Sequence, residues 1–109
     1  MLRLTELRLP LNHSEEELRA AILKELEIEG QDLTRYSIFR RSFDARKRGA
    51  IALIYHIDVE TTREAEILRR LRAHPEIKNL GPTPDTSYHF VTKAPHGLTE
   101  RPIVIGMGP

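Results

Sequence analysis

Apolar residues occupy every second position of residues 51–59, and this alternation predicts a β-strand with one face toward a core. Aromatic and β-branched residues predict another strand at residues 36–43. Leucines also mark residues 2–11 as a strand, but they occupy both odd and even positions. Either a bulge near Thr5–Glu6 shifts the alternation, or both faces of this strand are partly covered.

Two segments show helical spacing of apolar residues instead. In residues 15–27 the apolar positions recur three and four apart, and Ser14 with Glu17 predicts a capping box at the start. A second box, Thr61–Glu64, predicts the start of another helix, which Pro75 ends.

A fourth strand is expected at residues 87–92, because Pro82 and Pro84 disfavour regular structure before it. The order is then β-α-β-β-α-β. With right-handed crossovers it predicts an α+β fold of the ferredoxin-like type, a four-stranded antiparallel sheet with both helices on one face. We expect residues 1–97 to form this domain.

The sheet face away from the helices carries apolar residues. The outward positions of the 51–59 strand are Ala52, Ile54, His56 and Asp58, of which the first two are apolar. A solvated antiparallel face is usually polar, so we expect another domain, a second copy or a ligand to cover it. The alternative is that Ala52 and Ile54 are isolated surface residues.

Composition excludes several kinds of site. The 109 residues include no cysteine, which excludes disulfides and thiolate metal sites, and the five histidines show no metal-ligand spacing. We therefore expect no metal. No apolar run approaches the roughly 20 residues that span a bilayer, and no secretory signal is visible. We expect a cytoplasmic protein that makes no membrane contact.

The net charge of +1 hides two opposite segments. Residues 12–32 carry seven acids and two bases, and residues 33–56 carry six bases and one acid. The second segment includes five clustered cations: Arg40, Arg41, Arg46, Lys47 and Arg48. They could contact a phosphate-bearing ligand, a nucleic-acid backbone or an acidic partner, or form a solvated hairpin tip that pairs with the acidic helix.

Base stacking of the RNA-recognition type is disfavoured. Such domains stack bases on aromatic residues of the two central strands, where this chain has Ala50 and Ala52. The aromatic residue there, Tyr55, falls on the helix-facing side. Nucleic acid is therefore an unlikely partner, although the sequence does not exclude contact with its backbone.

Residues 101–109 carry the sharpest functional signal. A short apolar strand, Ile103–Ile105, leads directly into Gly106, Gly108 and Pro109. In a dinucleotide-binding fold the first glycine makes the tight turn, and the second lets the backbone approach the pyrophosphate. The alternative is a flexible end.

Three stretches carry a family resemblance: Phe39–Lys47, Pro82–Thr86 and Arg101–Pro109. With them the chain resembles the N-terminal region of bacterial uncharacterised FAD-dependent oxidoreductases, described as NAD(FAD)-utilising dehydrogenases. In that family a ferredoxin-like accessory domain precedes an FAD-binding Rossmann domain. The resemblance implies that residues 98–109 are a linker and the first strand and turn of that second domain.

By the same resemblance, Gly106, Gly108 and Pro109 would line the FAD pyrophosphate in the full-length parent, whereas the chain alone would bind no cofactor. We expect a docking domain that is not catalytic by itself and whose partner is the FAD-binding domain of the same chain. A homodimer through the open sheet face is a further expectation. The alternative is a stand-alone module that binds nucleic acid or another polyanion through Arg40–Arg48.

Overall fold

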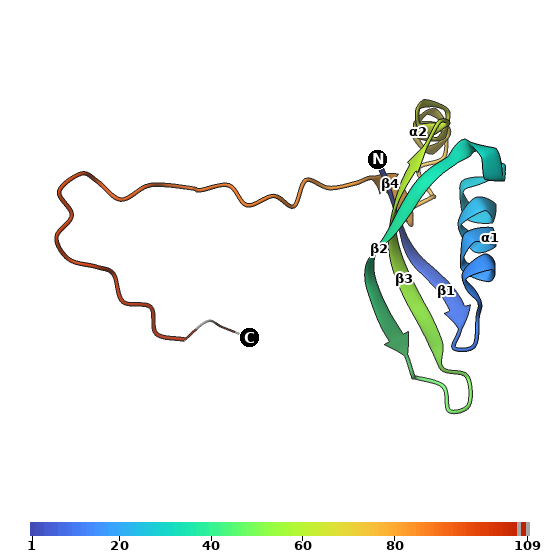
Figure 1. Cartoon of the computed structure of the whole chain (residues 1–109), viewed down its shortest axis with the longest axis horizontal. Helices are drawn as coiled ribbons and strands as arrows, with labels where there is room; N and C mark the ends of the chain where they lie inside the picture. The colour runs from blue at the N-terminus through green and yellow to red at the C-terminus, as the bar shows by residue number, and fades with distance from the viewer. Residues whose placement is uncertain (107, 109) are drawn as a thin grey trace.

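The computed structural model describes residues 1–106 and 108, and its folded part is a sheet covered by helices (Figure 1). The strands form one antiparallel sheet in the order β2-β3-β1-β4. The elements along the chain are β1 (Leu2–Pro10), α1 (Glu15–Leu26), the 3₁₀ turn η1 (Gly30–Asp32), β2 (Leu33–Asp44), β3 (Ala52–Thr61), α2 (Glu64–Ala73) and β4 (Leu80–Pro82). The predicted α+β fold with the βαββαβ order is confirmed.

One hydrophobic core joins both helices to one face of the sheet. The alternate residues of β3 that the sequence pattern pointed inward are all buried, whereas their neighbours are half-buried. Helix α1 adds Leu18, Ile22 and Leu26, and α2 adds Ile67. The opposite face of the sheet has no helix over it among the described residues, so it is the open face.

A bulge in β1 explains its leucines. The register of β1 against β3 shifts between Leu4 and Leu7, and Glu6 there has a φ of 58°. The shift moves the alternation by one residue, so Leu2, Leu4 and Leu7 are all buried on the helix side. The leucines therefore give no support to a covered open face.

Helix α1 begins as the sequence predicts. The Ser14 hydroxyl accepts a hydrogen bond from the Glu17 amide at 3.2 Å, and the Glu17 carboxylate accepts from the Ser14 amide at 3.3 Å. Each group satisfies an amide that the first helical turn leaves without a partner. The predicted capping box is confirmed.

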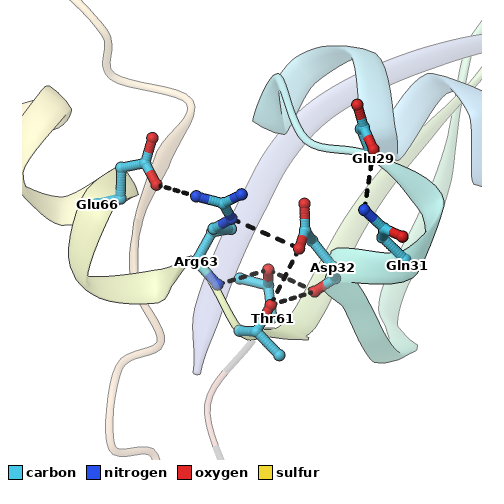
Figure 2. A network of polar contacts seen from close by, with 7 residues as sticks. Glu29, Gln31, Asp32, Thr61, Arg63 and Glu66 are labelled. Carbon is cyan, nitrogen blue, oxygen red and sulfur yellow. Dashed lines mark hydrogen bonds and ion pairs between the residues drawn. The ribbon is translucent and has the colours of Figure 1, made fainter.

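The predicted box at the start of α2 is wrong. Helix α2 begins at Glu64, and a polar network replaces the box (Figure 2). The Thr61 hydroxyl donates to the Asp32 carbonyl at 2.7 Å and accepts from the Arg63 amide at 3.1 Å. Arg63 also lies 3.4 Å from the Asp32 carboxylate and 2.9 Å from Glu66. The helix start is thus fastened to η1, 30 residues earlier, instead of being capped locally.

The fourth strand also differs from the prediction. Residues 87–92 form no strand, and β4 lies earlier, where Leu80 pairs with Leu4 and Pro82 with Leu2. Leu80 is buried in the core. Pro82 is tolerated because β4 is an edge strand, where a missing amide costs no ladder hydrogen bond.

Beyond Pro82 the chain forms an extended tail, which we define as residues 83–106. It has no helix or strand and runs away from the folded part (Figure 1). Its apolar residues are strongly exposed: Tyr88, Phe90, Val91, Leu98, Ile103, Val104 and Ile105. None of these features tests whether the first domain ends at residue 97, so that boundary stays a prediction.

Candidate functional site

The predicted cations lie on the hairpin between β2 and β3, on different surfaces. Arg40 pairs in register with His56 on the open face, and Arg41 pairs with Tyr55 on the helix-facing side. The two side chains thus point to opposite faces, as predicted. Arg46, Lys47 and Arg48 lie in the connecting loop.

Asp44 holds the base of this hairpin. Its carboxylate accepts hydrogen bonds from Arg8 at 2.6 Å and from Arg46 at 2.7 and 2.9 Å, and its side chain is only 8% exposed. The hydrogen bonds from Arg46, and then from Arg8, hold the pKa of Asp44 well below its usual range. This ion pair joins β1 to the loop and fixes where the loop cations begin.

The other cations of the cluster are unpaired. Within residues 1–106, no carboxylate lies within ion-pair distance of Arg40, Arg41, Lys47 or Arg48. The interpretation that they pair with the acidic first helix is therefore wrong. The positive charge of the hairpin remains available to a partner.

A shallow pocket of about 310 Å³ lies beside these cations. It is lined by Arg8, Asp44, Arg46, Lys47 and Ala50. Three cations face one carboxylate there, so the pocket has a net positive charge. Its chemistry suits a carboxylate or phosphate of a docking partner rather than an apolar ligand.

The open face is more polar than the sequence pattern indicated. Arg3 forms a two-pronged ion pair with Asp58, at 2.8 and 3.0 Å, and the two side chains are 12% and 14% exposed. The Phe39 ring lies over the Arg3 guanidinium, 3.7 Å from its carbon to the ring centroid. Hydrogen bonding to Asp58 raises the pKa of Arg3 above its ordinary value.

The sequence analysis missed this cluster of Arg3, Asp58 and Phe39. Its signal was present, because Arg3 and Asp58 are outward residues of neighbouring strands and pair directly in the register. Ala52 and Ile54 remain as half-buried apolar residues of β3 on the same face. The open face is therefore a mixed surface of ion pairs and a few apolar groups, and not the apolar face that the sequence led us to expect.

The predicted cofactor residues lie at the end of the tail and just after it, far from the hairpin loop in sequence. Gly106 and Gly108 have φ values of +77° and +74°, a conformation that favours glycine, and no described atom approaches the position of a Cβ on either one. Pro109 lies outside the described residues. The structure does not bring these glycines together with a nucleotide-binding helix within residues 1–106.

Metal ligation finds no support in the part of the chain that the structure describes. Over residues 1–106 and 108, no three His, Asp or Glu side chains gather closely enough to hold a metal ion. Over the same residues, no helix is both long and apolar enough to span a membrane.

Two comparisons relate the chain to known proteins. A family model described as "Domain of unknown function (DUF8436)" matches residues 1–60, which include β1, α1, β2 and nearly all of β3. A protein of Clostridium beijerinckii (strain ATCC 51743 / NCIMB 8052), described as "Uncharacterized protein", is 26% identical over 112 residues. The match covers 99% of this chain and 20% of that relative, so the chain spans a fifth of the relative's length.

Proposed function

The chain belongs to the DUF8436 family, and we propose that it serves as a docking domain, without catalysis of its own, for an FAD-dependent oxidoreductase unit in the same protein. Gly106, Gly108 and Pro109 would then contact the FAD pyrophosphate in that unit. A nicotinamide nucleotide as redox partner and a cytoplasmic location belong to the same proposal.

The observation that carries this proposal is the end of the tail. Ile103, Val104 and Ile105 are 83–95% exposed, although such residues form buried strands when a partner is present. After them come Gly106 and Gly108, both with positive φ. Glycines at this spacing after a strand allow a tight turn and a close approach of the backbone to a pyrophosphate. The relative is five times as long as the matched segment, which leaves room for a further unit in that protein.

The folded part supports a docking role through its surface. Within residues 1–106 it presents four unpaired cations on the β2–β3 hairpin and a rigid ion pair, Arg3–Asp58, on the open face. Charged groups of this kind orient an encounter and select an acidic partner surface. We propose that the FAD unit contacts this hairpin and the open face. A second copy on the open face is the competing occupant.

The test uses flavin absorbance on the full-length protein that contains this chain. We expect it to purify with FAD and expect Gly108→Val to abolish most of that binding, because the added side chain keeps the backbone from the pyrophosphate. Gly97→Val is the matched control, since Gly97 also has a positive φ and an open surrounding. It should retain its flavin.

The chain of residues 1–109 alone should show no flavin spectrum when mixed with FAD. Stoichiometric binding by this chain would contradict the docking proposal, and so would a full-length protein without flavin. Equal loss of flavin in the Gly97 and Gly108 variants would show that the effect is on folding and not on the cofactor.

The unpaired cations favour one second candidate, a module that binds nucleic acid or another polyanion. Its test is the salt dependence of binding to a mixed-sequence nucleic acid. Lys47→Ala with Arg48→Ala should lower the slope of log K against log salt by about 2 if both contact phosphates. Arg69→Ala with Arg72→Ala removes the same charge from exposed positions of α2 and should leave the slope unchanged. Equal slopes in both variants would exclude the hairpin as the binding site.

A further inference from the structure

The outer edge of β2 is open for pairing. In the order β2-β3-β1-β4, this 12-residue strand pairs only with β3 among the described strands. Alternate residues of such an edge strand direct their amides and carbonyls outward, which invites the addition of another strand. On its helix-facing side, Ile38 and Phe43 are 49% and 65% exposed.

The tail contains a segment that fits this edge. Residues Ser87–Thr92 form no helix or strand in the described chain and bend at Val91. They contain no Asp, Glu, Lys or Arg and have the aromatic content of a strand. Tyr88 and Phe90 contact each other edge to face, with ring centroids 5.1 Å apart. Their two rings therefore form one apolar surface, which is exposed within the described chain.

We propose that Ser87–Thr92 of a second copy of this chain adds to the outer edge of β2 as a fifth strand. In antiparallel pairing with Tyr88 opposite Ile38, Phe90 would lie beside Tyr36, the next residue of β2 on the same face. Two copies exchange tails in this way, so that each sheet gains one strand. Backbone hydrogen bonds give such an addition its affinity, and the aromatic pair sets its register.

The segment between β4 and Ser87 is too short for the tail to reach the β2 edge of its own molecule, so the added strand comes from a second copy. Pro82 lies in β4, at the opposite edge of the sheet from β2. A strand placed outside β2 lies four strand spacings from β4, about 19 Å. The chain from Pro82 to Ser87 spans at most about 18 Å, and its path must also climb over a face of the sheet. The tail of one molecule therefore cannot reach its own β2 edge.

Charge favours pairing of β2 with the tail of a second copy rather than with the β2 strand of that copy. Strand β2 carries Arg35, Arg40 and Arg41, and pairing two β2 strands edge to edge would bring these arginines of both copies together. Like charges on adjacent strands are destabilising. The segment Ser87–Thr92 brings no lysine or arginine and so avoids this repulsion.

This inference is independent of the flavin proposal, because it concerns residues 1–109 alone and requires no cofactor. Its first test is the mass of the chain by sedimentation at rising concentration. We expect a reversible dimer, and expect Phe90→Asp to raise the dissociation constant at least tenfold, because a carboxylate would be buried against Tyr36 and Ile38. The matched control is Val104→Asp, in an equally extended and exposed part of the tail.

Phe90 makes no contact with the core, so its variant should fold like the parent chain. The inference is overturned if the chain is still a monomer at about 100 μM. A dimer that Phe90→Asp and Val104→Asp weaken equally overturns it too.

The second test uses the absence of native cysteine. One chain carries Ile38→Cys, another carries Tyr88→Cys, and the mixture is oxidised. Facing residues on paired strands lie close enough for a disulfide, so we expect the mixed disulfide to form at least tenfold faster than with Val104→Cys in place of Tyr88→Cys. Equal rates would overturn the inference. If the tail paired instead beside its own β4, the mixed product would not form faster.

Discussion

Strand β3 and the end of the tail contain the same kinds of residues in opposite surroundings. Ile57 and Val59 in β3 are 0% exposed, whereas Val104 and Ile105 in the tail are 83% and 95% exposed. All four belong to short β-branched runs that favour a strand. Only the first two have neighbouring strands on both sides and helices above them.

A high β-strand propensity alone therefore does not make a strand. The alternation in β3 gives every second side chain a place in a shared core, and the outward residues between them are polar or small except for Ile54. Residues 103–105 are apolar in succession, a pattern typical of a strand buried on both faces. Such a strand needs two covering layers, and residues 1–106 provide neither of them.

The polar groups of the two regions differ in the same way. Asp44 in the folded part bonds to Arg46, two residues away, and to Arg8 of β1, 36 residues away, so its bond to Arg8 depends on the fold. Asp85 in the tail bonds to Ser87 and lies 3.6 Å from His89, which are two and four residues away. The pKa of both carboxyls is lowered. For Asp44 the causes are Arg46, two residues away, and then Arg8, 36 residues away, whereas for Asp85 they are its local neighbours Ser87 and His89.

The largest expected effect comes from truncating one residue in each region. Ile57→Ala should lower the free energy of unfolding by about 3 kcal/mol, because it leaves a cavity in a closed core. Ile105→Ala should change it by less than about 0.5 kcal/mol, since an exposed residue has no packing to lose. Urea denaturation followed by circular dichroism measures both. A large loss in the Ile105 variant would show that the tail packs on the fold in solution.

A medium effect is expected from removing one hydroxyl in each region. Ser14→Ala should cost about 1 kcal/mol, because the Glu17 amide loses its partner at the start of α1. Ser87→Ala removes hydroxyl contacts to Asp85 and His89 and should cost less than about 0.5 kcal/mol, because both neighbours are local. Equal losses, measured in the same urea titration, would contradict the division between fold and tail.

The sequence predicted those elements whose signals are local or periodic. The alternation of β3, the capping box of Ser14 and Glu17 and the stop before Pro75 all depend on residues close together in the chain. Strand β4 has only three residues, of which Leu80 alone is buried. A period cannot be recognised in so short a strand, and the more β-like composition of residues 87–92 predicts a strand there instead.

The features that sequence analysis missed all depend on contacts between distant residues. The start of α2 bonds to Asp32, and Asp44 bonds to Arg8, 36 residues earlier. For the Arg3–Asp58 pair, the bulge at Glu6 leaves the register before it intact, so outward alternation on the two strands could have suggested the contact. The predicted cations were placed on the correct hairpin, but their assumed partners on α1 were wrong.

The smallest expected effect is a difference in acid stability between two carboxyls. The hydrogen bond from Arg8, 36 residues away, is lost on unfolding, so the pKa of Asp44 is lower in the folded chain than in the unfolded chain, where an aspartate titrates at about 3.9. Unfolding therefore takes up a proton in acid, and the stabilisation by Asp44 is complete above about pH 5 and is lost as the pH falls through and below 4. Asp44→Asn has no such group, so its free energy of unfolding should fall less steeply between pH 5 and 3 than that of the parent chain.

Asp85→Asn is the matched control for this titration. Its partners Ser87 and His89 are neighbours along an extended tail and can be kept when the sheet unfolds. The lowered pKa of Asp85 then persists in the unfolded chain, which leaves no difference in proton uptake between the two states. We expect the pH dependence of this variant to match that of the parent chain. A flatter slope for Asp85→Asn would mean that the tail contacts near residue 85 form only together with the fold.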